Sequence, residues 1–557
     1  MISDKREVSD FLAELSASGI SDVVLSPGSR NAPFSISLFE HPKFNVIPVV
    51  DERSAAFIAL GIAQQTGRPA VLICTSGTAI LNYGPAVAEA YYQRIPMLVV
   101  SADRPAEWID HGEGQSIRQS GVFRNISKLN VDITPAEGIH DREMENLRVM
   151  REAIRSALSP AAGPVHLNFP FYEPLYGMRE ETEGRLLPET PVVVAEQPDY
   201  GAFREAIQPN SKVLLLVGQI RPMDGLNEAV HSFAQRNGIA VMSESHSNLA
   251  HPDFITTIDR LIMGWDNAER ERYAPDVLIT IGNNIISRKV KAWLRASACA
   301  HWCVDDAGGK EDTFRKLKGV LPASPLQFLD DLSDLSLSSS YASELIQLNR
   351  SVRTIAAEVV SSLPFSDLVV TGDILSHLPA GWDMQMGNSA VVRYIQLYDS
   401  RSDIRYFGNR GVSGIDGVTS TSVGAAHASQ RPTLLITGDI AFLYDSNAFW
   451  NALRPKHLRI IVLNNAGGGI FRIIDGPQSS PALGAYFETT HERSAGEVAA
   501  MYSIPFHSAS DPISLSSGFE WLFGQEEMSI LEICTPRLAN DEVLKSYFRQ
   551  LKERLNT

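Results

Sequence analysis

Polar residues follow two apolar runs in the C-terminal third of the chain, at points where strands are expected to end. Gly438 and Asp439 come directly after the run 433–437, and Asn465 follows the run 459–463. The segment between them is long enough for one crossover helix joining two parallel strands. Open α/β sheets bind their ligands at the carboxyl ends of such strands. Carboxylate and amide oxygens are hard ligands that suit Mg²⁺, so we predict a magnesium site formed by Asp439 and Asn465.

Glycines beside these two residues favour an anion next to the metal. Gly438, Gly467 and Gly468 would let the backbone approach a diphosphate closely, and the N-terminus of a following helix attracts negative charge. Each half of the pattern also has a simpler interpretation, because Gly-Asp after a strand and Asn-Asn before a turn are common turn sequences. Together, at two strand ends, they favour a site for a metal-bound diphosphate.

This pattern resembles the cofactor-binding motif of enzymes that use thiamine diphosphate. The motif usually reads Gly-Asp-Gly, and Ile440 replaces its last glycine here without removing a ligand. The resemblance implies thiamine diphosphate bound through Mg²⁺, with Mn²⁺ as an alternative ion. It also implies the Gly467 carbonyl as a third protein ligand, beside Asp439 and Asn465.

The resemblance further implies a glutamate in the N-terminal part of the chain that holds the cofactor's pyrimidine ring. Glu52 lies between the apolar run 46–50 and a helical pattern, where such a residue is expected. On its own, a glutamate in the first turn of a helix is more often a surface charge that interacts favourably with the helix dipole. We predict Glu52 as the catalytic residue because the C-terminal motif accompanies it.

A series of short sequences, in order along the chain, narrows the resemblance to one family. They are Ser26-Pro-Gly-Ser29-Arg30, Asp51-Glu52-Arg53, Thr75-Ser-Gly-Thr78, Ala102-Asp103-Arg104-Pro105, Gln115-Ser-Ile-Arg118-Gln119, Gly387-Asn-Ser389-Ala-Val-Val-Arg393 and Asn409-Arg410-Gly-Val-Ser-Gly-Ile415. The series resembles the 2-succinyl-5-enolpyruvyl-6-hydroxy-3-cyclohexene-1-carboxylate synthases, the thiamine-diphosphate enzymes of menaquinone synthesis. Gly114 and Ala466 depart from the family pattern, which has asparagine at both places.

The family's reaction implies a site rich in arginine. It decarboxylates 2-oxoglutarate and adds the remaining succinyl unit to isochorismate, and these substrates bring four carboxylates together. The planar guanidinium group binds a carboxylate through two hydrogen bonds, whereas the alternative for any single arginine is a surface ion pair. The arginine candidates within the matched motifs are Arg30, Arg104, Arg393 and Arg410. The neutral hydrogen-bonding candidates are Ser29, Gln115 and Ser389.

The remaining site predictions also rest on the resemblance. Arg288 and Lys289 stand where the family usually has a Lys-Arg pair, so the charge is kept while the geometry of a bidentate contact changes. Ile470 and Phe471 resemble apolar residues that face the substrate, and ordinary packing at a helix start is the alternative. The predicted cofactor contacts outside the metal site are Ser389, Gly414 and Ile415, the last as the apolar residue that bends the cofactor.

Short β-branched runs alternate with helical patterns, which predicts an α/β fold with parallel sheets. We expect the pyrimidine-binding, central and diphosphate-binding domains of thiamine-diphosphate enzymes at residues 1–186, 200–330 and 344–557. A Pro-rich acidic connection at 187–200 and a Ser/Asp/Leu-rich stretch at 330–343 separate them. The expected strands are 23–25, 46–50, 70–74, 97–101, 165–167, 213–217, 240–243, 277–281, 301–304, 368–371, 433–437, 459–463 and 530–533.

Composition excludes several classes of function. A formal net charge of −16 argues against nonspecific binding to nucleic acid. No apolar run approaches the ~18 residues of a membrane span, and the charged N-terminus has no apolar signal segment. We therefore expect a cytoplasmic protein without an integral membrane segment, whose four cysteines are free thiols. Since Glu52 and the metal site lie in different domains, the resemblance implies a site shared between subunits of a homodimer or homotetramer.

Two alternatives stay open at this point. Another thiamine-dependent 2-oxo acid decarboxylase or carboligase would share Glu52, Asp439 and Asn465 but would have no need of this set of arginines. A noncatalytic regulatory or scaffold protein with the same fold would have no need of those three residues.

Overall fold

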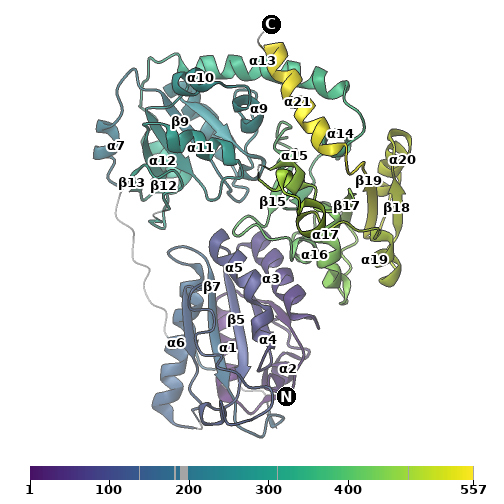
Figure 1. Ribbon diagram of the computed structural model, residues 1–557. Helices are drawn as coiled ribbons and strands as arrows, with labels where there is room; N and C mark the ends of the chain where they lie inside the picture. The colour runs from purple at the N-terminus through teal and green to yellow at the C-terminus, as the bar shows by residue number, and fades with distance from the viewer. Residues whose placement is uncertain (137, 181–183, 188–197, 310, 475, 556–557) are drawn as a thin grey trace.

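In a computed structural model, three parallel sheets that share no strand follow one another along the chain (Figure 1). The structure describes residues 1–557 except 137, 181–183, 188–197, 310, 475 and 556–557. All neighbouring strands within these three sheets are parallel, and helices cover both faces of each. A short antiparallel pair, β1 (Ile2–Ser3) with β8 (Met178–Arg179), joins the two ends of the first part.

The first sheet is buried on both faces, which explains its almost continuously apolar strands. Val23 and Leu25 pack against one layer of helices, whereas Val24 between them packs against the other. In sheet order its strands are β3 (Asn45–Pro48), β2 (Asp22–Leu25), β4 (Ala70–Cys74), β5 (Met97–Asp103), β7 (Pro164–Pro170) and β6 (Leu129–Asp132). One layer consists of α1 (Arg6–Ala17), α2 (Ala32–Leu38) and α6 (His140–Leu158), and the other of α3 (Glu52–Thr66), α4 (Ala79–Asn82) and α5 (Gly84–Gln93).

The second sheet repeats this arrangement with five strands. In sheet order they are β10 (Ala240–Ser243), β9 (Val213–Val217), β11 (Val277–Ile281), β12 (Ala300–Val304) and β13 (Leu317–Leu321). Its larger helices are α8 (Leu226–Asn237), α11 (Arg288–Ala296) and α12 (Pro325–Asp331), beside the short α7 (Gly201–Glu205), α9 (Ile258–Ile262) and α10 (Asn267–Arg272). The long α13 (Tyr341–Ser361) then packs against the second sheet and runs toward the third (Figure 1).

The third sheet carries the predicted metal site. In sheet order its strands are β15 (Arg405–Gly408), β14 (Asp383–Met386), β16 (Thr433–Gly438), β17 (Leu458–Asn464), β19 (Ser529–Cys534) and β18 (Phe506–Ala509). One face packs against α14 (Asp367–His377), α15 (Ala390–Ile395) and α20 (Pro512–Phe523), and the other against α16 (Val418–Ser429), α17 (Asp439–Tyr444) and α19 (Ala495–Met501). The short α18 (Ile470–Ile473) follows β17, and α21 (Asn540–Leu555) packs on α13.

The predicted strands agree with the observed ones wherever the apolar run lies in the middle of a sheet. The expected strand at 368–371 was wrong, because these residues belong to helix α14. The Ser366 side chain accepts a hydrogen bond from the Val369 amide at this helix's start, and Asp367 lies in its first turn. A short apolar run without these capping signals does not distinguish a buried strand from a buried helix. Part of the predicted connection at 187–200 lies outside the described residues.

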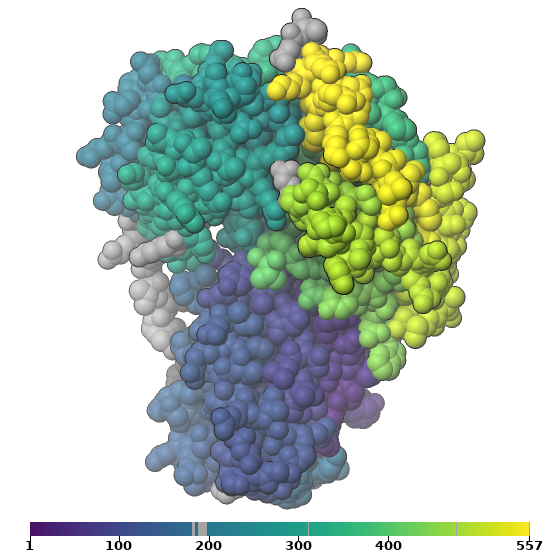
Figure 2. Space-filling view, viewed as in Figure 1, coloured from purple at the N-terminus to yellow at the C-terminus, as the bar shows by residue number. Residues whose placement is uncertain are grey.

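Helices α3 and α16 bring the first and third domains into close contact. A Cβ atom built on Gly61 of α3 would lie 2.0 Å from the Thr421 carbonyl oxygen of α16. A Cβ on Gly424 of α16 would lie 2.1 Å from the Ile58 carbonyl oxygen of α3. The two helix backbones therefore touch, and only glycine fits at either position. Figure 2 shows the first domain in contact with both other domains.

Among the described helices, none combines the length and the apolar composition that crossing a bilayer requires. All four cysteines are free thiols, as the sequence predicts.

We predict that Gly61→Ala and Gly424→Ala each lower the midpoint of thermal unfolding, followed by circular dichroism. The added methyl group would overlap a backbone carbonyl that cannot rotate away, and overpacking of this kind costs about 1–3 kcal/mol. Gly484→Ala is the matched control, because no protein atom lies within 4 Å of its Cβ position. Unchanged midpoints for the two helix variants would contradict the close contact.

Candidate active site

Asp439 and Asn465 meet at the carboxyl ends of two adjacent parallel strands, as predicted. The Asp439 side chain is buried and accepts hydrogen bonds from the Ile440 amide at 2.7 Å and the Gly467 amide at 2.9 Å. His491 Nε2 lies 3.3 Å from its Oδ2. Burial raises the pKa of Asp439 to about 6, against the opposing effect of these backbone hydrogen bonds and of His491. A nearby cation would favour the charged carboxylate.

The Asn465 amide is oriented by a second carboxylate. Its Nδ2 donates to Asp367 Oδ2 at 2.9 Å, and Asp367 also accepts from Thr535 Oγ1 at 2.5 Å. Asn465 Oδ1 is buried and has no hydrogen-bond partner among the described residues. A buried polar atom without a partner is costly. An oxygen fixed in this way, at the end of the strand next to the one that Asp439 follows, fits a hard divalent cation such as Mg²⁺.

Gly438, directly before Asp439, leaves space for an anion. A Cβ built on it would meet no atom of the described residues within 4 Å. Gly467 has φ of 155°, a conformation that L side chains rarely adopt, and the Gly468 amide donates to the Glu488 carbonyl at 2.6 Å. Residues around Glu488 therefore hold the glycine turn in place. The donor set and the open space together fit a metal-bound diphosphate.

Asn388 joins three predicted site segments. Its Nδ2 donates to the Gly414 carbonyl at 2.6 Å and to the Asn409 carbonyl at 2.8 Å, and its Oδ1 accepts from Arg410 at 2.5 Å. The next residue, Ser389, has φ of 68° and ψ of −122° and begins helix α15. The Asn388 amide thus fixes Ser389, Arg410 and the loop that carries Gly414 and Ile415 relative to one another.

A glutamate of the first domain holds the same loop from the other side. Glu89 on α5 is almost fully buried. Its carboxylate accepts hydrogen bonds from the backbone amides of Gly411 at 2.5 Å, Val412 at 2.8 Å and Ser413 at 3.3 Å. Sequence reasoning missed Glu89, since a glutamate inside a helical pattern carries no signal that distinguishes it from a surface charge.

Cationic side chains gather between the second and third domains. Burial lowers the pKa of Arg393 to about 10, with further contributions from the charges of Arg410 and Arg288. The Arg393 guanidinium donates to the Ser389 carbonyl. Burial also lowers the pKa of Arg410, while the carboxylates of Glu244 and Glu89 oppose that effect. The structure therefore brings Arg288, Arg393 and Arg410 into one electrostatic neighbourhood.

The predicted Lys289 lies elsewhere. Its Nζ is 4.9 Å from the centre of the Phe548 ring. Two residues further along α11, burial lowers the pKa of Lys291, with a smaller contribution from Arg410 and an opposing one from Glu244. Lys291 is thus the lysine of this helix that shares the neighbourhood of Arg410. A substrate contact of Lys289 stays a prediction.

Buried Glu244 fixes the start of helix α11. Its carboxylate accepts hydrogen bonds from the Ile286 amide at 2.6 Å and the Ser287 amide at 2.7 Å, directly before Arg288. Burial raises the pKa of Glu244 to about 7. This glutamate was not predicted either, because nothing in its sequence context marks it.

In the first domain, Glu52 is the first residue of helix α3, where it was expected. Asp51 caps the helix by accepting from the Arg53 amide at 2.9 Å. The Glu52 side chain is partly buried, and this burial raises its pKa. Burial, with a smaller contribution from the Glu52 charge, also raises the pKa of Cys74 and Tyr83. Glu52 thus lies close to β4 and α5, in surroundings that favour a protonated carboxyl.

The first-domain arginines lie together at the ends of β2, β4 and β5. Arg104 donates to Ser76 Oγ at 2.7 Å and to the Gln115 carbonyl at 3.0 Å. Buried Arg30 donates to the Phe171 carbonyl at 3.2 Å, and its pKa is lowered by burial and then by the Arg104 charge. The side chains of the predicted Ser29 and Gln115 beside them are exposed.

Ile470 and Phe471 form the first turn of α18, directly after the glycine turn. Ile470 is buried, and the Phe471 ring lies 5.6 Å from that of Phe487. These contacts are the packing that was the alternative for this pair, and the partly exposed Phe471 stays a candidate for substrate contact.

Backbone strain marks the predicted loops. Four non-glycine residues in them adopt positive φ: Gln115 (55°), Ser389 (68°), Ser413 (63°) and Ala466 (59°). Such conformations are uncommon outside glycine, and they concentrate at functional sites where the surrounding structure imposes them. Their positions agree with the site defined by hydrogen bonding.

The fold and the site at the strand ends define a thiamine-diphosphate enzyme. Residues 6–122 match the family described as the thiamine pyrophosphate enzyme N-terminal TPP binding domain, and residues 197–384 match the one described as the middle domain of thiamine pyrophosphate.

Comparison with curated proteins narrows this class. A 2-succinyl-5-enolpyruvyl-6-hydroxy-3-cyclohexene-1-carboxylate synthase of Flavobacterium johnsoniae is 41% identical, over 99% of this chain and 100% of the relative. Proteins of the same name from Flavobacterium psychrophilum (40%; 99% and 100%) and Porphyromonas gingivalis (37%; 98% and 97%) match over similar lengths. The chain belongs to the family of 2-succinyl-5-enolpyruvyl-6-hydroxy-3-cyclohexene-1-carboxylate synthases.

We predict that Glu89→Gln weakens the binding of thiamine diphosphate by about 10-fold or more, measured by fluorescence titration. The amide would place N–H groups against backbone N–H groups of residues 411–413, and a hydrogen bond to a charged group contributes about 1.5–3 kcal/mol. Glu14→Gln is the control, because Glu14 is equally buried in the first domain and pairs with Arg151 instead. If both variants lost stability but bound the cofactor normally, Glu89 would have no positioning role.

Proposed function

We propose that this chain binds thiamine diphosphate through a magnesium ion held by Asp439, Asn465 and the Gly467 carbonyl, with Mn²⁺ as an alternative ion. The observation that carries the metal assignment is the buried Asn465 Oδ1, which has no hydrogen-bond partner among the described residues and follows the strand next to that of buried Asp439. Gly438 and Gly468 would face the diphosphate, and Ser389, Gly414 and Ile415 would contact the rest of the cofactor. Thiamine diphosphate supplies the electron sink for loss of carbon dioxide from a 2-oxo acid.

Glu52 would hold a proton at the pyrimidine ring. A partly buried carboxyl whose pKa is raised is suited to share a proton with a ring nitrogen. It is the catalytic residue of the proposal.

The proposed reaction is decarboxylation of 2-oxoglutarate and addition of the remaining succinyl unit to isochorismate. Arg393, Arg410 and Arg288 would bind carboxylates on the side of the third domain, and Arg30 and Arg104 would do so on the side of the first. Ser29, Gln115 and Ser389 would orient the substrates through neutral hydrogen bonds, and Ile470 and Phe471 would cover their apolar parts. Paired, partly desolvated arginines of this kind suit dicarboxylates better than a simple 2-oxo acid.

We also propose that two chains share each site, in a homodimer or a homotetramer. Several apolar side chains near Glu52, and one in the loop that carries Gly414 and Ile415, are exposed in the single chain. Val50, Val412, Tyr444 and Trp450 are each 48–52% exposed. Exposed apolar residues that gather beside a functional site favour a subunit interface. The free thiols fit the reducing cytoplasm, which we propose as the place where the enzyme acts.

We expect Glu52→Gln to lower carbon dioxide release from 2-oxoglutarate by roughly 10²–10⁴-fold, because proton transfer by a positioned side chain contributes on this order. The assay measures carbon dioxide and analyses the products with and without isochorismate, so it also separates this function from that of another thiamine-dependent decarboxylase. Glu7→Gln is the matched control, as Glu7 is another glutamate in the first turn of a helix whose pKa burial raises. Near-normal rates for Glu52→Gln would refute the role of Glu52.

Metal removal provides a second test. Dialysis against a chelator should abolish activity, and Mg²⁺ or Mn²⁺ should restore it. Asn465→Ala should raise the Mg²⁺ concentration for half-maximal activation by at least about 10-fold, since changes even to residues behind a metal ligand cost 10–100-fold. The control is Asn349→Ala, a buried asparagine on α13 whose Oδ1 also lacks a described partner. Equal Mg²⁺ requirements for both variants would remove Asn465 from the site.

A further inference from the structure

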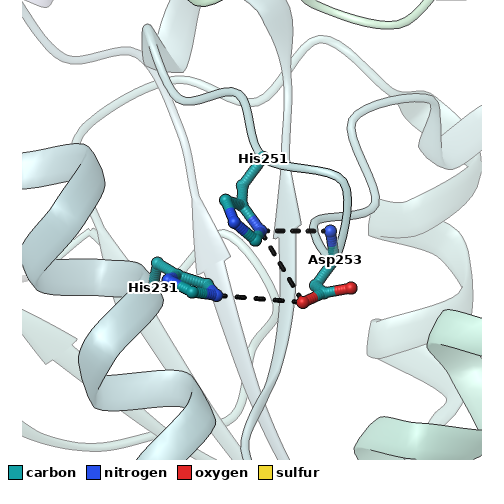
Figure 3. A group of neighbouring side chains, drawn as sticks. All are labelled: His231, His251 and Asp253. Carbon is teal, nitrogen blue, oxygen red and sulfur yellow. Dashed lines mark hydrogen bonds and ion pairs between the residues drawn. The ribbon is translucent and has the colours of Figure 1, made fainter.

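Two histidines and an aspartate come together in the second domain, in a cluster that the proposed reaction does not use (Figure 3). His231 lies on helix α8, whereas His251 and Asp253 lie in the loop after β10. Their ligating atoms all lie within 4.8 Å of one another. Among the described residues, this is the only group of three histidine, cysteine or carboxylate side chains with that spacing.

The facing atoms of this cluster are two imidazole nitrogens and one carboxylate oxygen. His231 Nε2 and His251 Nδ1 are each 3.8 Å from Asp253 Oδ2, which is too long for a hydrogen bond. The Asp253 amide donates to the Nδ1 lone pair of His251 at 3.2 Å, so a metal ion bound at this nitrogen would replace that hydrogen bond. Two imidazole nitrogens that face the same carboxylate oxygen at this distance are spaced as ligands of one cation.

We propose that His231, His251 and Asp253 form a site for a divalent transition metal ion of the zinc type. Two imidazole nitrogens and one carboxylate oxygen are a ligand set that suits zinc, whereas Mg²⁺ and Ca²⁺ prefer oxygen ligands alone. Water would complete the coordination. The three side chains are 27%, 28% and 33% exposed, so an ion reaches the site directly from solvent.

Neighbouring residues hold the three ligands in position. Arg350 on α13 donates to Asp253 Oδ1 at 2.7 Å, which leaves Oδ2 directed at both imidazoles. The two histidine rings lie with their centres 3.6 Å apart, and buried Phe254 packs beside both, at 5.4 Å from His251 and 6.3 Å from His231. Partners behind the ligands that fix their orientation are a regular feature of metal sites.

The bound ion would join parts of the chain that are separate in sequence. It would cross-link α8 to the loop 248–257, which α13 contacts through Arg350. In the same loop, Thr256 Oγ1 donates to Asp399 of the third domain at 3.2 Å. The role we assign to the ion is therefore to stabilise the second domain and its junction with the third, independently of the proposed reaction.

The test is a zinc titration of the full-length chain, with Mg²⁺ and thiamine diphosphate present at saturation so that the other metal site is occupied. We expect one Zn²⁺ per chain by calorimetry, visible absorption bands when Co²⁺ replaces it, and a higher midpoint of thermal unfolding with Zn²⁺. His231→Gln and His251→Gln should each weaken Zn²⁺ binding by at least about 10-fold and remove the thermal shift. Both should retain the Mg²⁺-dependent activity, which shows that they fold.

His140→Gln is the matched control, because His140 is an exposed histidine at the start of α6, outside the cluster. It should bind Zn²⁺ like the unmodified chain. The proposal is overturned if the unmodified chain binds no Zn²⁺ under these conditions, or if both cluster variants bind it as tightly as His140→Gln does.

Discussion

The backbone contact between α3 and α16 fixes the position of the first domain against the third within one chain, and the contact of Glu89 with residues 411–413 depends on it. Glycines at 61 and 424 let the two helices approach until each is in contact with a carbonyl group of the other. At that distance Gln64 on α3 reaches Gln385 on β14, with a hydrogen bond of 3.0 Å between their buried side chains. Asp51, next to Glu52, accepts from Asn447 of the third domain at 2.8 Å. The same packing brings α5, and therefore Glu89, to the loop that carries Gly414 and Ile415.

Buried carboxylates then fix the loops that carry the functional residues. Glu89 binds the amides of 411–413, Glu244 those of 286 and 287, and Asp367 the side-chain amide of Asn465. Burying a carboxylate is costly unless hydrogen bonds to it are complete, so each loop has one favourable arrangement rather than several. The functional groups at the ends of these loops are therefore held in one position each. None of the three carboxylates needs to touch a ligand to do this.

How much of the fold the sequence could predict depends on whether neighbouring residues alone indicate each strand or helix. The strands at 70–74, 213–217 and 277–281 were predicted to the residue, because buried parallel strands are continuous apolar runs. Edge strands such as β15 and β18 were missed, since polar residues such as Arg405 and His507 interrupt their apolar pattern. The wrong prediction of a strand at 368–371, in helix α14, has the opposite cause. Its apolar run was long enough for a strand, and the capping residue Ser366 was not considered.

The candidate site divides in the same way. Asp439, Asn465 and Glu52 could be placed at strand ends because the apolar runs before them can be recognised in the sequence. Glu89 and Asp367 could not, because their role exists only once segments far apart in the chain are in contact. Lys291 shows a further limit: successive residues of a helix point in different directions, so the resemblance that named Arg288 and Lys289 gave no signal for Lys291, and the substrate contact of Lys289 stays a prediction.

If the cations between the second and third domains bind the substrates as proposed, they explain how an acidic protein can accept acidic substrates. The chain has a net charge of −16, yet Arg288, Lys291, Arg393 and Arg410 share one neighbourhood with fewer carboxylates. Burial, and then repulsion by Arg410 and Arg288, lower the pKa of Arg393 to about 10, which still leaves it protonated at neutral pH. Positive charge held in a partly desolvated place is unfavourable until an anion arrives. In the proposed site a dicarboxylate would relieve that repulsion on binding, so the local field, and not the net charge of the chain, would select the substrate.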